Sequence, residues 1–572
     1  MPRHRRRNFY LTAEDVLQLL DADDSDEEGL MEVDEEDAVF LHENAPERPN
    51  EVVEVGIDDA GIDEVVTEHG PSEREMNFRW SKRCPSLIIP APKQGLGELG
   101  ITFNPVSFPN PAAIFKAVSR FPTLLSDILI PESIVYMQQK GEPFNIDEEE
   151  MEAFIGIIFV MSYHRLPDMK LYWSKEADVR VPVIADVMTR SRFFEIKRAL
   201  HFNNNDDAID KNDPAYDRAW KVRPLIKHFN EAFQAALSPT AEQSIDERMV
   251  KFKGQSTMKQ YMKDKPIQRG FKHWCRNDSK TGYVFEIDMY TGKNKSPEVG
   301  LSEAVVLQLT RKITGRNIHL YIDNFFTSPS LLSKLKKDEI FCTGTVRQNR
   351  KGMPKDFLAD KSMDRGAVDA RHCDGMFAVK WMDNKAVHLL STITSSKEMI
   401  TVRRRQKGQK EKVSVPCPAM IRDYNNGMNG TDVMDQRTKP YSFDRRSPTK
   451  YYTRPSFDYL EMAVVNSFII QEKLAETEWA GDRPKTLLDF KRKIALSLIG
   501  SYTSRARPAT SRPAVCPPSF HRVAMVETKG CCKFCYAQNR KDVKVFTKCE
   551  TCQVHLCISK GKDCFNQFHD TL

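Results

Sequence analysis

The spacing of apolar residues changes along the chain and predicts regions of different fold. Between residues 109 and 240 apolar side chains recur every three or four positions, as Met151, Phe154, Ile155 and Ile158 do, which is typical of helices packed on a core. The predicted helices are Pro109–Ser126, Asp147–Tyr163, Val183–Met188, Ser191–Leu200 and Arg223–Leu237. We therefore predict an α-helical region here.

From residue 242 onward predicted strands alternate with predicted helices, which favours a mixed α/β sheet. The predicted strands are Glu242–Phe252, Tyr283–Met289, Asn317–Ile322 and Ile340–Val346, and the predicted helices are Leu301–Ile313 and Ser330–Lys337.

After residue 347 the pattern changes again. The runs Phe377–Met382 and Ala386–Ile393 flank an Asp-Asn turn and predict a hairpin. Arg403–Lys412 is strongly basic, and we expect a solvated loop there that could bind phosphate. The sequence therefore predicts a β-rich insertion.

Two acids belong to the predicted sheet. The strand Asn317–Ile322 runs directly into Asp323, and Ser328 can cap the helix that follows. Asp246 lies in the first strand, and adjacent strands are about 5 Å apart, so the two carboxylates could face each other across the sheet. An Asx turn at Asp323 is the alternative interpretation.

A further pair of acids follows a stretch rich in Asn and Gly. Asp432 and Asp435 stand three residues apart at a predicted helix start, and hence on one helical face. Alone this is an ordinary acidic first turn. With Asp246 and Asp323, however, the set matches a two-metal nuclease, because Mg²⁺ prefers oxygen ligands and two ions can activate water and stabilise a leaving oxygen.

Charge is strongly segregated along the 572 residues. Residues 12–70 hold 22 Asp and Glu against one Arg, whereas residues 71–572 carry 80 basic and 58 acidic side chains. A basic body suggests a polyanion partner such as nucleic acid, although a solvated surface with a disordered acidic arm gives the same balance. No run of 18 apolar residues predicts a membrane span, and Met1–Arg7 lacks the apolar stretch of a secretory signal.

Eight of the 13 cysteines follow residue 515, in pairs that favour zinc over disulfides. Seven ligands are Cys532, Cys535, Cys549, Cys552, Cys557, Cys564 and His569. Two tetrahedral zinc ions need eight, and His521 and His555 both remain candidates. An interleaved cross-brace, as in RING or PHD domains, is expected, and it could recruit a ubiquitin-conjugating enzyme, read a histone tail or, since it is basic, bind DNA.

Five motifs, in this order, resemble the piggyBac transposase family. They are Ser244–Val250 (SIDERMV), Lys265–Lys272 (KPIQRGFK), Asp323–Ser328 (DNFFTS), Gly344–Arg347 (GTVR) and Asp432–Gln436 (DVMDQ), and the resemblance covers roughly residues 109–569. Met428–Thr431 departs from the Gly-Gly-Val-like approach that the family usually has before the third acid.

The resemblance implies an RNase H-like catalytic domain in which Asp246, Asp323 and Asp432 match the catalytic triad and Asp435 a further acid. It implies His521 as the eighth zinc ligand. It also implies a homodimer that excises DNA at TTAA sites through hairpin ends, with helices near 455–473 and 484–499 returning to the helical domain for dimerisation and DNA binding.

The predicted fold is thus an α+β multidomain chain: an RNase H-like α/β core with a β-rich insertion, a flanking α-helical dimerisation and DNA-binding domain, and a C-terminal cross-brace zinc domain. The predicted boundaries are 1–108 acidic arm, 109–241 helical, 242–346 catalytic, 347–422 insertion, 423–440 catalytic, 441–500 helical, 501–516 basic linker and 517–572 zinc domain.

The predicted function is that of a nuclear DNA transposase that acts on double-stranded DNA, with Mg²⁺ or Mn²⁺ in the catalytic site and two Zn²⁺ in the C-terminal domain. Two alternatives remain open. One is a domesticated derivative that binds DNA without cutting it, and the other is a zinc-dependent chromatin adaptor.

Overall fold

The computed structural model describes residues 78–85, 89–100, 108–263, 265–292, 300–395, 397–405, 411–443, 450–477, 479–504, 521–539, 542–559 and 562–570. The chain divides into two compact units, Met1–Tyr502 and Thr503–Leu572. The acidic stretch of residues 12–70 and most of the predicted linker lie outside the described residues. No helix within the described ranges combines the length and apolar character needed to cross a bilayer.

Helices dominate the first part of the larger unit. They are α3 (Pro111–Val118), α4 (Phe121–Leu124), the π-helical turn η2 (Leu125–Leu129), α5 (Ile130–Gln139), α6 (Glu148–Tyr163), α7 (Pro182–Ala185), α8 (Arg190–Ala199) and α9 (Arg223–Ala236). Asp147 caps α6 by accepting from the Glu150 N–H at 2.8 Å. The single predicted helix over Pro109–Ser126 is wrong, because the chain breaks at Arg120, whose φ is 46°.

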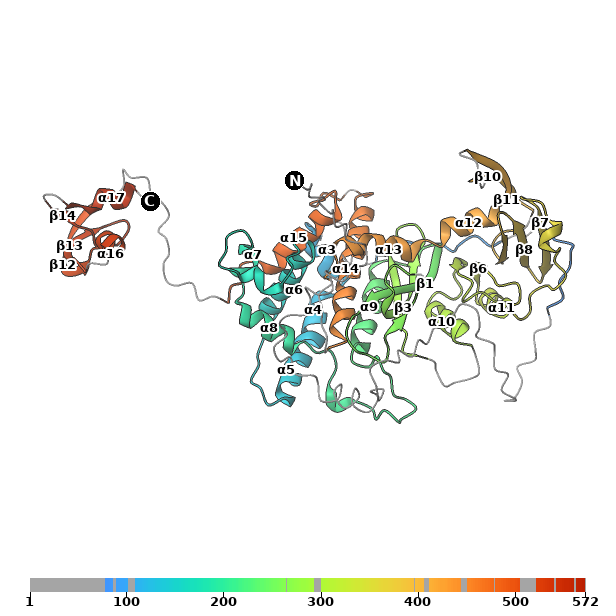
Figure 1. The fold of residues 1–572 in the computed structure, drawn as a ribbon, viewed down its shortest axis with the longest axis horizontal. Helices are drawn as coiled ribbons and strands as arrows, with labels where there is room; N and C mark the ends of the chain where they lie inside the picture. The colour runs from blue at the N-terminus through green and yellow to red at the C-terminus, as the bar shows by residue number, and fades with distance from the viewer. Residues whose placement is uncertain are drawn as a thin grey trace, which may run out of the picture. The chain divides into compact units, whose positions relative to one another are not determined.

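Two late helices complete the same hydrophobic core. α14 (Thr453–Leu474) packs against α3 and α9, and α15 (Leu487–Ile499) packs against α6 and α3. Figure 1 shows these two orange helices among the blue and cyan ones. α6 and α15 approach so closely that a Cβ on Gly156 would lie 2.8 Å from the Ala495 carbonyl oxygen, so only glycine fits there.

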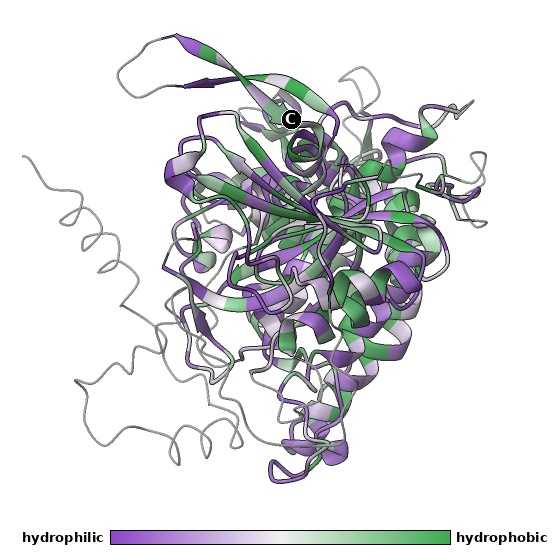
Figure 2. Ribbon diagram, turned by 90° about the vertical axis from the view of Figure 1, so that its right-hand side faces the viewer, coloured by the Kyte–Doolittle hydropathy of each residue, from purple (hydrophilic) through white to green (hydrophobic). Residues whose placement is uncertain are grey.

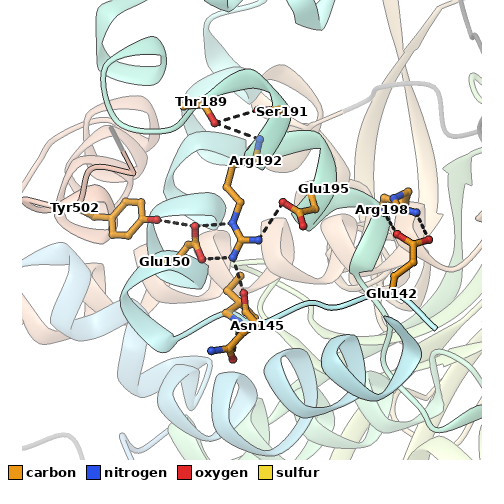
Figure 3. Close-up of polar contacts among 10 residues, drawn as sticks. Glu142, Asn145, Glu150, Thr189, Ser191, Arg192, Glu195, Arg198 and Tyr502 are labelled. Atoms are coloured by element: carbon orange, nitrogen blue, oxygen red, sulfur yellow. Dashed lines mark hydrogen bonds and ion pairs between the residues drawn. The ribbon is translucent and has the colours of Figure 1, made fainter. Parts of the chain in front are cut away.

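A polar cluster ties the end of the larger unit to this core (Figure 3). The Tyr502 hydroxyl donates to Glu150 Oε1 at 2.6 Å, and Arg192 Nε donates to the same carboxylate oxygen at 2.9 Å. Arg192 also pairs with Glu195 at 3.1 Å. The segment that follows α15 is thereby attached to α6 and α8.

One mixed sheet forms the centre of the larger unit. Its strands are β1 (Glu242–Lys251), β2 (Gln260–Tyr261), β3 (Arg269–Asp278), β4 (Val284–Met289), β5 (Ile318–Ile322), β6 (Ile340–Thr345), β7 (Val368–Cys373), β8 (Met376–Met382) and β9 (Ala386–Ser391). Within the described chain their order is β2-β3-β1-β5-β6-β9-β8-β7, with β4 also paired to β3. β5 lies parallel to both β1 and β6, and the other pairings are antiparallel. β5 therefore lies in the interior of the sheet, between β1 and β6.

The sheet separates two cores. Phe271 and Phe285 join the core of the helices, whereas Trp274 and Leu320 face a second core with α10 (Leu301–Thr310) and α11 (Pro329–Lys337). Ser328 caps α11, as predicted, by accepting from the Leu331 N–H at 3.1 Å. Helices α12 (Ala419–Gly427) and α13 (Gly430–Thr438) return the chain to the sheet.

The basic stretch of the insertion is part of a two-stranded ribbon. β10 (Met399–Arg405) pairs antiparallel with β11 (Lys412–Pro418) and extends away from the sheet (Figures 1 and 2). The predicted loop over Arg403–Lys412 is therefore wrong for Arg403–Arg405 and for Lys412, which are strand residues. Alternating valines on one side of the ribbon supply the apolar face that makes it a strand pair.

The smaller unit is built from short elements. They are β12 (Val523–Cys531), α16 (Lys533–Asn539), β13 (Lys544–Cys549), β14 (Ile558–Ser559), β15 (Lys562–Asp563) and α17 (Cys564–Asp570). Its buried core consists of five cysteines with Leu556 and Phe565. So few apolar side chains leave most of the core to the cysteines.

Candidate functional site

Three carboxylates meet where β1 and β5 lie side by side. Asp246 and Glu247 of β1 and Asp323, which follows β5, each place one carboxylate oxygen within 4.8 Å of the others. The parallel register pairs Ile245 with Ile322, so the next residue on each strand is an acid. The expected approach of Asp246 and Asp323 across the sheet is confirmed by this geometry. Glu247 is an addition that sequence reasoning missed, since alternation along a strand assigns it to the opposite face.

The backbone holds Asp323 in a fixed turn. Its carboxylate accepts from the Phe325 N–H at 3.0 Å, while its carbonyl accepts from the N–H and the hydroxyl of Thr327 at 3.2 and 2.7 Å. A Cβ on Gly344 of β6 would lie 2.1 Å from the Thr327 hydroxyl, so glycine leaves room for this turn. The Asx-type turn and the candidate ligand are thus the same residue, and the two interpretations do not exclude each other.

Two of the three acids, Asp246 and Asp323, have raised pKa values. Burial, together with the charge of Glu247, raises the pKa of Asp246 to about 7, and the same two causes raise the pKa of Asp323 to about 6. All three groups are carboxylates, so the donor set fits a hard divalent cation such as Mg²⁺ or Mn²⁺.

Two lysines border the acids. Lys265 Nζ lies 3.2 Å from one oxygen of Glu247, and Lys272 Nζ lies 3.8 Å from the other. Burial lowers the pKa of Lys265, but the charges of Glu247, Asp246 and Asp432 outweigh it, and the pKa is raised. These lysines begin and end the motif Lys265–Lys272, whose sequence alone does not indicate a contact with the acids.

The two acids of α13 lie in different environments. Asp432 is exposed on the first turn and does not belong to the group of three, although its charge acts on Lys265. Asp435 forms an ion pair with Arg248 Nε. A Cβ on Gly430 would lie 2.5 Å from Ser244 Oγ, so α13 packs closely on β1. The metal role predicted for Asp432 and the catalytic role predicted for Asp435 stay predictions.

Arg248 of β1 connects its strand to helices α13 and α14. The side chain is 5% exposed, and besides Asp435 it pairs with Asp458 of α14 at 2.5 Å and donates to the Thr438 hydroxyl at 2.9 Å. Asp435 therefore anchors α13 to β1 in this structure. The only sign of this contact in the sequence is that Arg248 lies two residues after Asp246 in the same strand.

The predicted zinc ligands form two groups of four in the smaller unit. Cys532, Cys535, Cys557 and Cys564 make one group, and His521, Cys549, Cys552 and His569 make the other. In each group one ligand atom per residue lies within 4.8 Å of the rest. Because the two groups alternate along the sequence, the expected interleaved arrangement is present.

His521 rather than His555 stands with the second group. His521 Nδ1 lies 3.2 Å from Cys552 Sγ and 3.5 Å from Cys549 Sγ. His569 places Nδ1 2.7 Å from the Phe565 carbonyl oxygen and Nε2 3.5 Å from Cys552 Sγ. The ring of His555 instead packs against Gly530. Thiolate and imidazole donors in sets of four suit a metal such as zinc.

A family model described as transposase IS4 matches residues 111–468, more than half of the chain. The chain belongs to this transposase family. It is similar to human PiggyBac transposable element-derived protein 3, with 29% identity over 415 residues that cover 69% of this chain and 67% of that protein. It is also similar to human PiggyBac transposable element-derived protein 2, with 27% identity over 387 residues that cover 66% and 63%. The predicted piggyBac-type membership is confirmed, and the chain spans about two thirds of the length of these curated relatives.

Among solved structures, the chain is similar to the cryo-EM structure of the piggyBac transposase synaptic complex with hairpin DNA. The TM-score is 0.63 at 21% identity, over 80% of this chain and 97% of that one. This match shows a shared fold, and the predicted fold class of this piggyBac-type chain is confirmed with it. The three acids of the sheet and the two Cys/His groups are the candidate centres within that fold.

Proposed function

We propose that the chain is a metal-dependent DNA transposase that cuts and rejoins phosphodiester bonds. The observation that carries the proposal is the meeting of Asp246 and Asp323 on adjacent parallel strands of a piggyBac-type fold. Asp432, on a helix packed against the same strand, is proposed as the third acid. When bound, Mg²⁺ or Mn²⁺ would supply Lewis acidity for phosphodiester hydrolysis and strand transfer.

The chain's own residues prepare this chemistry. Asp323 is fixed by its turn and Asp246 by the sheet, so the two carboxylates do not need to reorganise when a cation binds. Lys265 and Lys272 offset negative charge at Glu247, and both can contact a phosphate that approaches the acids.

The partner in this proposal is double-stranded DNA with transposon ends and a TTAA target, bound by a homodimer in the nucleus. The structurally similar protein is a piggyBac transposase in a synaptic complex with hairpin DNA, and its fold supports the DNA partner. Two Zn²⁺ in the smaller unit, one in each Cys/His group, would organise a basic domain that binds transposon ends.

A domesticated protein that binds DNA without cutting it is the second candidate. The two human relatives are named as transposable element-derived proteins, which favours it. The retained Asp246, Asp323 and Asp432 favour the active enzyme. The two candidates differ in a single measurable property, cleavage of authentic ends.

The test is to incubate the full-length protein with end-containing DNA and Mn²⁺ or Mg²⁺, and to compare the wild type with Asp323→Asn. We expect the wild type to nick and form hairpins. Asp323→Asn should bind DNA equally but lose several kcal/mol of transition-state stabilisation, so that cutting falls at least about a thousandfold.

Asp288→Asn is the matched control, because Asp288 lies in the same sheet but pairs with Arg223 at 2.5 Å and has no place in the acid group. Glu247, although it also neighbours the triad, cannot serve as a control because it belongs to that group. A wild type that binds ends but never cuts them supports the domesticated protein. An Asp323→Asn variant that cuts normally refutes the site.

A further inference from the structure

The ribbon of β10 and β11 presents two different faces. The antiparallel register pairs Arg403 with Ser414 and Arg405 with Lys412, so these side chains share one face. Arg403, Arg405, Lys412 and Ser414 are all exposed. Glu411, which precedes Lys412 in the chain, is exposed as well.

The opposite face fixes the ribbon to the sheet. Val402, Val413 and Val415 pack in a core with Trp381 of β8. Trp381 Nε1 donates to the Pro416 carbonyl at 2.8 Å, and Arg404 lies over the Trp381 ring at 5.6 Å. The ribbon is thus a supported projection whose basic outer face does not serve its own folding.

The three outward cations also lack partners of their own. Across the described residues, none of Arg403, Arg405 and Lys412 forms an ion pair, whereas the inward Arg404 lies 3.5 Å from Asp383. Unpaired cations gathered on one face would attract a polyanion, and neutralising a phosphate releases counterions.

We propose that this face of the ribbon docks on duplex DNA and contacts its phosphates. A two-stranded ribbon is about 5 Å wide between strand axes, and a B-form major groove of about 12 Å admits it. Arg403 and Arg405, two residues apart, lie about 7 Å from each other along the strand. The inference rests on the proposed function only in taking DNA as the partner.

The ribbon would add binding rather than chemistry. The candidate acids lie on β1 and after β5, whereas the ribbon is attached through β8, on the far side of β6 and β9 in the sheet order. A DNA contact here would therefore hold a part of the duplex away from the bond to be cut, and cleavage is not needed to detect it.

The experiment measures equilibrium binding of the full-length protein to duplex DNA, without divalent metal, across a range of salt concentrations. The triple variant Arg403→Ala, Arg405→Ala and Lys412→Ala should lower the slope of log K against log salt by about 2 to 3, at roughly 0.9 for each phosphate contact. A charge-keeping variant, Arg403→Lys with Arg405→Lys, should retain the wild-type slope.

The control variant removes three exposed lysines that lie outside the insertion, Lys175, Lys312 and Lys337, and so makes the same change in net charge elsewhere on the larger unit. It should leave the slope within about one unit of the wild type. Equal losses in the two triple variants would mean a bulk charge effect and would overturn the inference, as would an unchanged slope in the ribbon variant. Duplex RNA, whose deep and narrow major groove does not admit a ribbon, should show no selective loss.

A selective loss of RNA binding, with DNA binding intact, would also overturn the inference. The melting temperature should not differ among the variants, since the substituted side chains are exposed. If the triple ribbon variant has a lower melting temperature than the wild type, the Arg→Lys variant is used in its place. A lowered salt slope in the Arg→Lys variant would count against the phosphate contact. A wild type that binds no DNA at all refutes the DNA partner of the proposed function, which is a different result from a wild type that binds without using the ribbon.

Discussion

The acid group of the sheet and the Cys/His groups of the smaller unit are built in opposite ways. In the sheet, Asp246 lies within β1 and Asp323 directly follows β5, and neither side chain belongs to the apolar core beside these strands. In the smaller unit the candidate ligands are themselves most of the core. The acid group is thus a charged site on a sheet with its own apolar core, whereas the Cys/His groups provide most of the buried core of the smaller unit.

This difference decides what a bound metal does. At the acid group a cation would offset the negative charge of Asp246 and Asp323, whose pKa values are raised chiefly by burial. At the Cys/His groups it would supply the folding free energy of the unit.

Removing zinc from the full-length protein should unfold the smaller unit and leave the larger one folded. Zinc binding in small domains contributes about 10–16 kcal/mol, and the unit has little other core to replace it. Elemental analysis should find two zinc ions per chain. After chelation, trypsin should cleave at Lys529, Lys544 and Lys548 while residues 111–499 stay protected. Continued protection of these lysines in fully zinc-free protein would contradict the comparison.

Arg248→Met should destabilise the larger unit by about 3–5 kcal/mol, because it leaves the buried Asp458 without its partner. The cost should be the same with and without divalent metal, since Arg248 holds α13 and α14 to β1 by itself. Urea unfolding of the single variant and of Arg248→Met with Asp458→Leu gives the measurement.

The double variant should recover most of the loss, as both buried charges are then gone. Arg492→Met, which breaks an exposed pair with Asp489, is the matched control and should cost about 1 kcal/mol or less. A loss that disappears when Mn²⁺ is added would show that metal, not Arg248, orders this part of the fold.

Mn²⁺ should stabilise the larger unit by about 2–3 kcal/mol at a hundredfold excess over its Kd, because it binds only the folded acids. Asp246→Asn should abolish this gain, whereas Asp288→Asn should keep it. Calorimetry with and without Mn²⁺ measures the difference. If Asp246→Asn gains as much stability as the wild type, the cation binds elsewhere.

His555→Ala should have the smallest effect, at roughly 1 kcal/mol, since His555 belongs to neither Cys/His group. The protein should still hold two zinc ions. His521→Ala should instead weaken the second site, because it removes one of four ligands. Zinc titration of both variants distinguishes them, and a loss of zinc in His555→Ala alone would reverse the assignment.

The sequence predicts the periodic elements of this fold well and its buried polar ones poorly. Apolar alternation predicts β4 and β5 but does not predict β3, although β3 has 10 residues, as many as β1. Eight of the last nine residues of β3 are buried, and they include His273, Arg276 and Asn277. Arg276 is satisfied by Gln243 at 2.6 Å and by Glu286 at 3.1 Å, partners that only the fold brings near. A strand whose polar groups are paired on both faces shows no alternation to detect.

The candidate site divides in the same way. The sequence places Asp246 in one strand and Asp323 at the end of another, which allows the two carboxylates to meet, but the parallel register that pairs Ile245 with Ile322 is visible only in the fold. The presence of Glu247 in the acid group and the pairing of Asp435 with Arg248 depend on side-chain conformations in the folded protein, which the sequence does not give. The composition of each Cys/His group was also beyond the sequence, because interleaved ligands can be divided in several ways until the chain's path is known.

The burial of α14 has a consequence for how the chain is made. All but Glu472 and Lys473 of its 22 residues are buried, yet it emerges from the ribosome long after the helices that it packs against. At about 5–20 residues per second, the 216 residues between Ala236 and Thr453 take roughly 10–40 s to synthesise. During that time the apolar faces of α3 and α9 that later contact α14 are exposed and can be bound by chaperones. A product that stops before Thr453 would expose those faces permanently, so early termination should yield aggregates rather than a smaller working protein.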